Sequence, residues 1–125
     1  MKVFVLITAV IELLAGLVFF FAPHLIPDLT NANPLSTTLA KMYGGAALGL
    51  GLFALQVWRH MRSQVMQQAF LKTFLLFHFG VAAAGYFGYS NGAFKDLSTC
   101  ILHLTLGLVT AYFLFATRNK GTATT

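Results

Sequence analysis

Apolar residues gather in four long runs along this chain, and short polar segments separate the runs. The runs cover about residues 3–22, 42–58, 70–89 and 97–117. A helix needs about 20 apolar residues to cross the hydrocarbon core of a bilayer, at a rise of about 1.5 Å per residue. The pattern therefore predicts an all-α protein, a transmembrane four-helix bundle over residues 1–120 with a flexible tail at 121–125.

Local signals mark where these runs begin and end. Pro23 is expected to end the first helix, because proline cannot donate a backbone hydrogen bond. Prolines and asparagines from residue 24 onward predict a loop. Asn33 and Pro34 predict the next helix start, since asparagine caps a first turn and proline tolerates it. A further short turn is expected at residues 90–96.

Composition makes a bilayer the expected surrounding of this chain. Of its residues, 58% are hydrophobic and only 9% are charged, which leaves too little polar surface for a water-soluble domain of 125 residues. The net charge of +5 does not indicate nucleic acid, because the Lys and Arg residues lie at the ends of the apolar runs. We interpret the first run as a retained span, because it is too long for a cleaved signal peptide.

The distribution of cations predicts the orientation of the four spans. An even number of spans places both termini and the second loop on one side of the membrane. That side holds more cations than the other: Lys2, Arg59, Arg62, Arg118 and Lys120, against Lys41 and Lys95. By the positive-inside rule, both termini are cytoplasmic (N-in/C-in). For a bacterial source, the chain is a multi-pass protein of the cell inner membrane.

Glu12 is the residue most informative about function, because an ionised carboxylate at the bilayer centre costs about 3 kcal/mol or more. At helical rise Glu12 lies about 14 Å from the cytoplasmic end of its span, and His78 lies about 12 Å deep. The two side chains can meet if their helices adjoin. Two interpretations are open: a hydrogen-bonded clamp that could include Thr8, Tyr43 or Thr105, or a functional pocket that exchanges a proton.

His103 is expected to lie away from this pair. It is about 21 Å from the cytoplasmic end, some 9 Å from the level of His78. This offset argues against a haem held by both histidines. Cys100 is expected to pack within its helix rather than act as a nucleophile. No cofactor fingerprint, metal-ligand spacing or hydrolytic triad is recognisable, so the cofactor stays unknown.

Small residues also recur at helical spacing. Gly45 and Gly49 are four residues apart, and Gly80, Ala84 and Gly88 repeat the spacing in the third run. Such spacing lets helix backbones approach closely. We expect these stripes to pack helices within the bundle, with a ligand groove or an oligomer seam as the alternatives.

Two segments carry a resemblance to a known family. They are the run from Glu12 to Leu17 (ELLAGL) that leads to Pro23, and the run from Lys41 to Gly51 (KMYGGAALGLG), followed by Phe77-His78 and Leu102-His103. The chain resembles the DoxX-like group of small four-span membrane proteins. The resemblance implies that the ligand-binding residues are Glu12, Tyr43, His78 and His103. It also makes a quinone or another lipophilic molecule a conceivable partner.

Three functional hypotheses follow from these observations. The first is a ligand-binding or accessory subunit with an intramembrane polar pocket around Glu12 and His78. The second is a quinone-linked redox subunit. The third is a small proton-coupled transporter, which would be a homo-oligomer because four spans enclose little volume. The sequence leaves open whether the protein is an enzyme.

Overall fold

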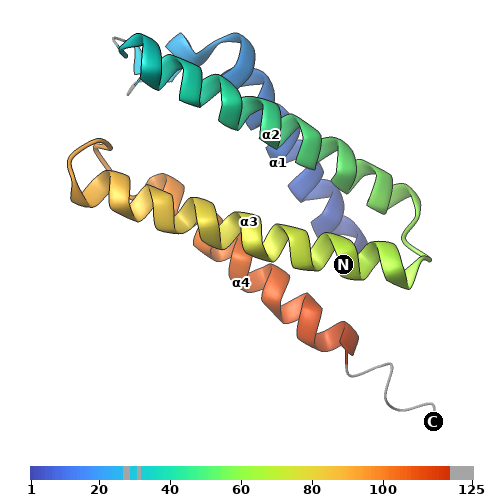
Figure 1. Ribbon diagram of the computed structural model, residues 1–125. Coiled ribbons are helices and arrows are strands. Elements are labelled where there is room, and N and C mark those ends of the chain that lie inside the picture. The colour runs from blue at the N-terminus through green and yellow to red at the C-terminus, as the bar shows by residue number, and fades with distance from the viewer. Residues whose placement is uncertain (27–28, 31, 119–125) are drawn as a thin grey trace. The chain divides into compact units, whose positions relative to one another are not determined.

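The computed structural model describes residues 1–26, 29–30 and 32–118 (Figure 1). The predicted tail at 121–125 lies outside the described residues, as do Lys120 and part of the loop after Pro23. The described elements are all helical: α1 Lys2–Phe21, the short 3-10 helix η1 Pro23–Leu25, α2 Pro34–Arg59, α3 Gln64–Ser90 and α4 Ser98–Arg118. The predicted all-α class is confirmed for this part of the chain.

The helix boundaries follow the local signals of the sequence. α1 ends at Phe21, and Pro23 begins η1, so the predicted stop is confirmed. Asn33 caps α2, because its Oδ1 accepts a hydrogen bond of 2.9 Å from the Ser36 amide, and Pro34 is the first helical residue. α2 therefore begins several residues before the apolar run at 42, and its first turns are polar.

The chain is divided into two compact units, residues 1–63 and 64–125. The first unit contains α1, η1 and α2, and the second contains α3 and α4. In each unit the two long helices pack along each other as a hairpin.

Glycines let α1 and α2 approach closely in the first unit. A Cβ atom placed on Gly44 would lie 2.5 Å from the Phe20 amide nitrogen, and one on Gly16 would lie 2.7 Å from the Leu48 amide nitrogen. The predicted contact through Gly45 and Gly49 is wrong in detail. Both are exposed, and no described atom lies within 4 Å of a Cβ on Gly49.

The buried stripe of α2 explains this correction. It runs at spacings of three and four residues, through Ala40, Gly44, Ala47, Gly51, Ala54 and Val57. This spacing follows one face of a helix of 3.6 residues per turn. Gly45 and Gly49 stand on another face, so a small-residue spacing identifies a flat stripe without saying that it is the contact stripe.

Close approach also positions α4 against α3 in the second unit. A Cβ on Gly85 would lie 3.2 Å from the Cys100 amide nitrogen, and the Phe94 ring of the connecting turn covers Gly88. Farther along, the Gln68 side-chain amide donates a hydrogen bond of 3.1 Å to the Thr117 hydroxyl. The predicted helix contact through Gly80, Ala84 and Gly88 is wrong, because Gly80 and Ala84 are exposed and Gly88 meets Phe94 of the turn rather than a neighbouring helix.

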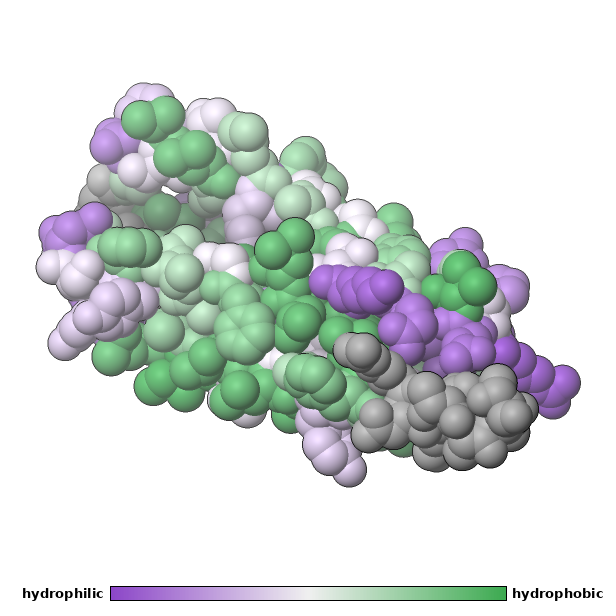
Figure 2. Space-filling view, turned by 60° about the horizontal axis from the view of Figure 1, so that its bottom comes forward, coloured by the Kyte–Doolittle hydropathy of each residue, from purple (hydrophilic) through white to green (hydrophobic). Residues whose placement is uncertain are grey.

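Large apolar side chains face outward along the helices. Leu14, Leu76 and Phe87 are 60%, 78% and 67% exposed, respectively. Figure 2 shows that apolar residues dominate the visible face and that hydrophilic residues gather toward its ends. Each of α1 to α4 is long and apolar enough to cross a membrane. These outward faces suit lipid rather than water, and the protein is a multi-pass membrane protein with four apolar helices in its described part.

Candidate functional site

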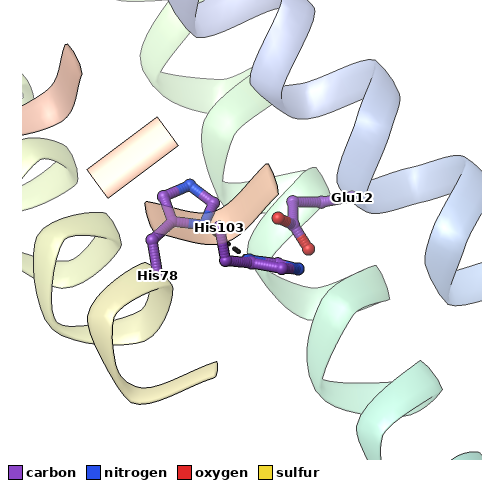
Figure 3. A group of neighbouring side chains, drawn as sticks. All are labelled: Glu12, His78 and His103. Atoms are coloured by element: carbon purple, nitrogen blue, oxygen red, sulfur yellow. Dashed lines mark hydrogen bonds between the residues drawn. The ribbon is translucent and has the colours of Figure 1, made fainter. Parts of the chain in front are cut away.

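Two buried histidines of the second unit hydrogen-bond directly to each other. His78 projects from α3 and His103 from α4, and their Nδ1 atoms lie 3.0 Å apart (Figure 3). His78 is fully buried and His103 is 5% exposed. A hydrogen bond between two ring nitrogens needs one donor and one acceptor, so a neutral pair carries the Nδ1 proton on one ring only.

The separation predicted between these two histidines is wrong. The contacts of Gly85 with Cys100 and of Gln68 with Thr117 fix the antiparallel register of α3 and α4. In this register Gly107 lies level with His78, so His103 is displaced by four residues, or about 6 Å along the helix axis. The expected offset of about 9 Å was too large because it took residue 70 as the inner end of α3. The imidazole side chains span the smaller offset.

Aromatic rings enclose the histidine pair. The Phe74 ring centroid lies 5.5 Å from that of His78, and the Phe77 centroid lies 5.4 Å from His78 and 5.8 Å from His103. Phe74 is fully buried. These apolar neighbours exclude water and lower the local dielectric, which strengthens a correctly made hydrogen bond and fixes both ring orientations.

Glu12 lies on the buried face of α1 in the first unit. The buried residues of this helix are Val5, Thr8, Ala9, Glu12 and Gly16, and the Glu12 side chain is fully buried. Figure 3 shows its carboxylate projecting from α1. Thr8 is one turn away on the same face, and its hydroxyl has no hydrogen-bond partner among the described residues. The face that α1 buries therefore carries two polar side chains in an otherwise apolar span.

Tyr43 of the first unit and Thr105 of the second unit are the remaining polar side chains that the sequence suggested for a clamp or a pocket. The Tyr43 ring packs edge-on against Phe19, with centroids 4.9 Å apart, and Phe19 lies two turns beyond Glu12 in α1. Thr105 is exposed, and its hydroxyl donates to the Ile101 carbonyl of its own helix. Tyr43 therefore packs against α1 in the unit that holds Glu12, and the Thr105 hydroxyl bonds within its own helix.

Three buried side chains in the described part are of types that bind metals. Glu12 offers a carboxylate oxygen, and His78 and His103 each offer an imidazole nitrogen. Histidine and carboxylate ligands suit zinc and other first-row transition metals. Cys100 is half-buried against Gly85, in keeping with the packing role expected for it.

Sequence reasoning missed the partnership of His103 with His78. The signal that could have revealed it is the short connection at 90–96, which makes α3 and α4 antiparallel neighbours. A comparison of the chain with family models, curated proteins and solved structures finds no match.

Proposed function

We propose that this protein is a DoxX-like, ligand-binding or accessory subunit of the cell inner membrane, oriented with both termini in the cytoplasm. Its ligand is a small lipophilic or protonatable molecule. The polar centre that receives the ligand is formed by His78 and His103 together with Glu12, with Tyr43 at its edge. The observation that carries the proposal is the hydrogen bond between two buried imidazoles in membrane-spanning helices.

The histidine pair supports ligand binding because polar groups in hydrocarbon are costly and need a compensating role. A leucine or phenylalanine at both positions would pack the same hairpin without desolvating imidazoles. The Nδ1 atoms are used by the mutual hydrogen bond, so Nε2 atoms are the groups that would meet a ligand. Neutral imidazole nitrogens can donate to a carbonyl or accept from a hydroxyl.

The inclusion of Glu12 is supported by depth along the spans. Glu12 is ten residues, or about 15 Å, beyond Lys2 in α1. His78 is likewise ten residues beyond Gln68, the residue bonded to Thr117 near the end of α4. Carboxylates within membranes pair, lose their charge or line a polar cavity. A shared polar centre would satisfy this requirement for Glu12 and both histidines at once.

The test is extraction of bound small molecules from the purified full chain in lipid nanodiscs. Wild-type protein is compared with Glu12→Gln and His78→Asn by mass spectrometry of the extract, and thermal unfolding is measured in parallel. We expect a lipophilic compound to copurify with wild type and to be reduced about tenfold or more in both variants. Thr110→Val is the matched control, because it removes a buried hydroxyl that donates to the Leu106 carbonyl of α4 and to no other described residue.

Two results would contradict the proposal. Unchanged compound content with a lowered melting temperature in Glu12→Gln and His78→Asn would indicate a structural clamp. An equal loss in Thr110→Val would indicate a general effect of destabilisation. Crosslinking between Glu12→Cys and His78→Cys in a Cys100→Ser background tests the shared centre independently of any ligand.

The hydrogen-bonded imidazoles also favour a second candidate, a quinone-linked or proton-coupled role. The pair holds a proton between two bases, and the rings of Phe74 and Phe77 beside it could stack on a flat ligand. A quinone in the extract that is lost in Glu12→Gln would support the redox alternative. Flux into proteoliposomes that depends on a pH gradient would support a transporter.

A further inference from the structure

A shallow hollow lies on the first unit, where α1 begins and α2 ends. Its volume is about 400 Å³. The residues that line it come from the start of α1, the last turn of α2 and the segment after it: Lys2, Trp58, Arg59, His60, Met61, Arg62 and Ser63. All belong to residues 1–63, so the hollow is complete within one unit.

The hollow is strongly cationic. Lys2, Arg59 and Arg62 are exposed, and none of the described residues that line it is acidic. The nearest acidic residue along α1 is Glu12, about 15 Å away at helical rise and fully buried. Three like charges around one hollow repel each other, and a bound anion would relieve this repulsion.

The end of α2 is arranged so that its carbonyl groups do not oppose an anion. The last carbonyls of a helix carry partial negative charge. Here the His60 backbone amide donates to the carbonyls of Gln56 and Val57, and the His60 ring Nδ1 donates to Gln56 at 2.9 Å. His60 therefore occupies two carbonyl groups of the last turn of α2 with hydrogen bonds.

A tryptophan sets the level of the hollow in the membrane. The Lys2 ammonium lies 5.4 Å from the centroid of the Trp58 ring, a cation–π contact that holds the cation over the hollow. Tryptophan side chains favour the headgroup level of a bilayer. Val3 and Ile7 of α1 continue from this level as exposed apolar side chains, 70% and 50% exposed. A cationic hollow thus adjoins a lipid-facing apolar stripe.

We propose that this hollow binds the phosphodiester headgroup of an anionic phospholipid, whose acyl chains lie along the exposed face of α1. The guanidinium groups of Arg59 and Arg62 match phosphate oxygens in a bidentate manner, and Lys2 adds a point charge. The apolar stripe favours a phospholipid over free phosphate, because only a lipid fills the hollow and covers the stripe. This site is independent of the polar centre proposed above.

The experiment measures lipid binding to the purified full chain by native mass spectrometry and by thermal unfolding. The probes are phosphatidylglycerol, phosphatidylcholine and inorganic phosphate. Each cation near a membrane surface contributes about a fivefold gain for an anionic lipid, so Arg59→Gln with Arg62→Gln should weaken phosphatidylglycerol binding about thirtyfold. Arg62→Gln alone should weaken phosphatidylglycerol binding about fivefold. This single variant provides the test if the double variant does not fold.

The matched control is Lys41→Gln with Lys95→Gln, which removes the same net charge from helix α2 and the 90–96 turn, outside the hollow. We expect this control to bind phosphatidylglycerol like wild type. Equal weakening in both double variants would overturn the proposal, since net charge alone would then explain binding. Stabilisation by inorganic phosphate equal to that by phosphatidylglycerol would overturn the lipid assignment. Equal binding of phosphatidylcholine would do the same.

Discussion

His78 and His103 share a hydrogen bond between their Nδ1 atoms, although their positions on α3 and α4 differ by about one helical turn. The bond is diagonal across the hairpin, and it fixes one nitrogen of each ring in a buried, aromatic environment. It therefore links the register of the second unit to the orientation of the groups that could meet a ligand. Each histidine therefore affects both the stability of the hairpin and the chemistry of the site, and these two effects can be measured separately.

The structural part predicts strong coupling between the two histidines. His103→Leu should lower the free energy of unfolding by about 1–3 kcal/mol, because the His78 imidazole then stays buried without its hydrogen bond. The double variant His78→Leu with His103→Leu should cost less than the sum of the single variants, by about 0.5–2 kcal/mol. Unfolding in mixed detergent measures all three. Additive losses would show that the hydrogen bond does not stabilise the hairpin.

The contact stripe of α2 gives a prediction that separates two neighbouring glycines. Gly44→Ala should destabilise the first unit by about 1–3 kcal/mol, because the new methyl group meets the backbone of Phe20 and cannot push it aside. Gly49→Ala should be neutral or stabilising by up to about 1 kcal/mol, since alanine favours helix and meets open space. Thermal unfolding of both variants tests this. Equal destabilisation would contradict the assigned stripe.

These glycines show how far the sequence predicts this fold. Four apolar helices, the stop at Pro23 and the cap at Asn33 were predictable, because each depends on local chemistry or on length. The choice of Gly44 over Gly45 as a contact was not. Which face of a membrane helix contacts a neighbouring helix depends on the partner. A span that is apolar on all sides gives little indication in its sequence of which face that is.

The candidate site was predictable in the same partial way. Ionisable residues inside apolar spans identify Glu12 and His78 as unusual without any structure. The role of His103 depended on the register of α3 and α4. Gln68 rather than residue 70 lies level with Thr117, and this difference of two residues changes the offset by about 3 Å. Helix ends are the least reliable part of a prediction from sequence, and a contact between side chains is sensitive to them.

The turn before α4 predicts a pH-dependent contribution to stability. The Asp96 carboxylate accepts a hydrogen bond of 2.8 Å from the Ser98 amide, and hydrogen bonds from Ser98 hold its pKa below the ordinary value of 3.8. A group whose pKa is lower in the folded than in the unfolded protein adds its full contribution to stability above its unfolded-state pKa. That contribution is lost as the pH falls through its folded-state pKa. Asp96→Ala should thus lower the melting temperature by about 2–4 °C at pH 7, and the difference should narrow below about pH 4.

Asn91 supplies the control for this pH dependence. Its side-chain oxygen accepts a hydrogen bond from the Ala93 amide at 3.2 Å in the same turn, but it does not titrate. Asn91→Ala should therefore lower the melting temperature by the same amount at pH 7 and at pH 3. A pH-independent loss in Asp96→Ala would show that its charge adds nothing to the turn.

The proposed orientation gives the final prediction. Five cations flank the side that carries Arg59 and Arg62, against two on the other side, which favours a cytoplasmic position for the segment between α2 and α3. Cys100 is the only cysteine, so Cys100→Ser provides a background for single reporters. Gln64 and Asn91 are both exposed and lie at opposite ends of α3. In intact cells a membrane-impermeant maleimide should label Asn91→Cys and should label Gln64→Cys only after lysis. The reverse pattern would invert the orientation and place the cationic hollow beside the outer leaflet.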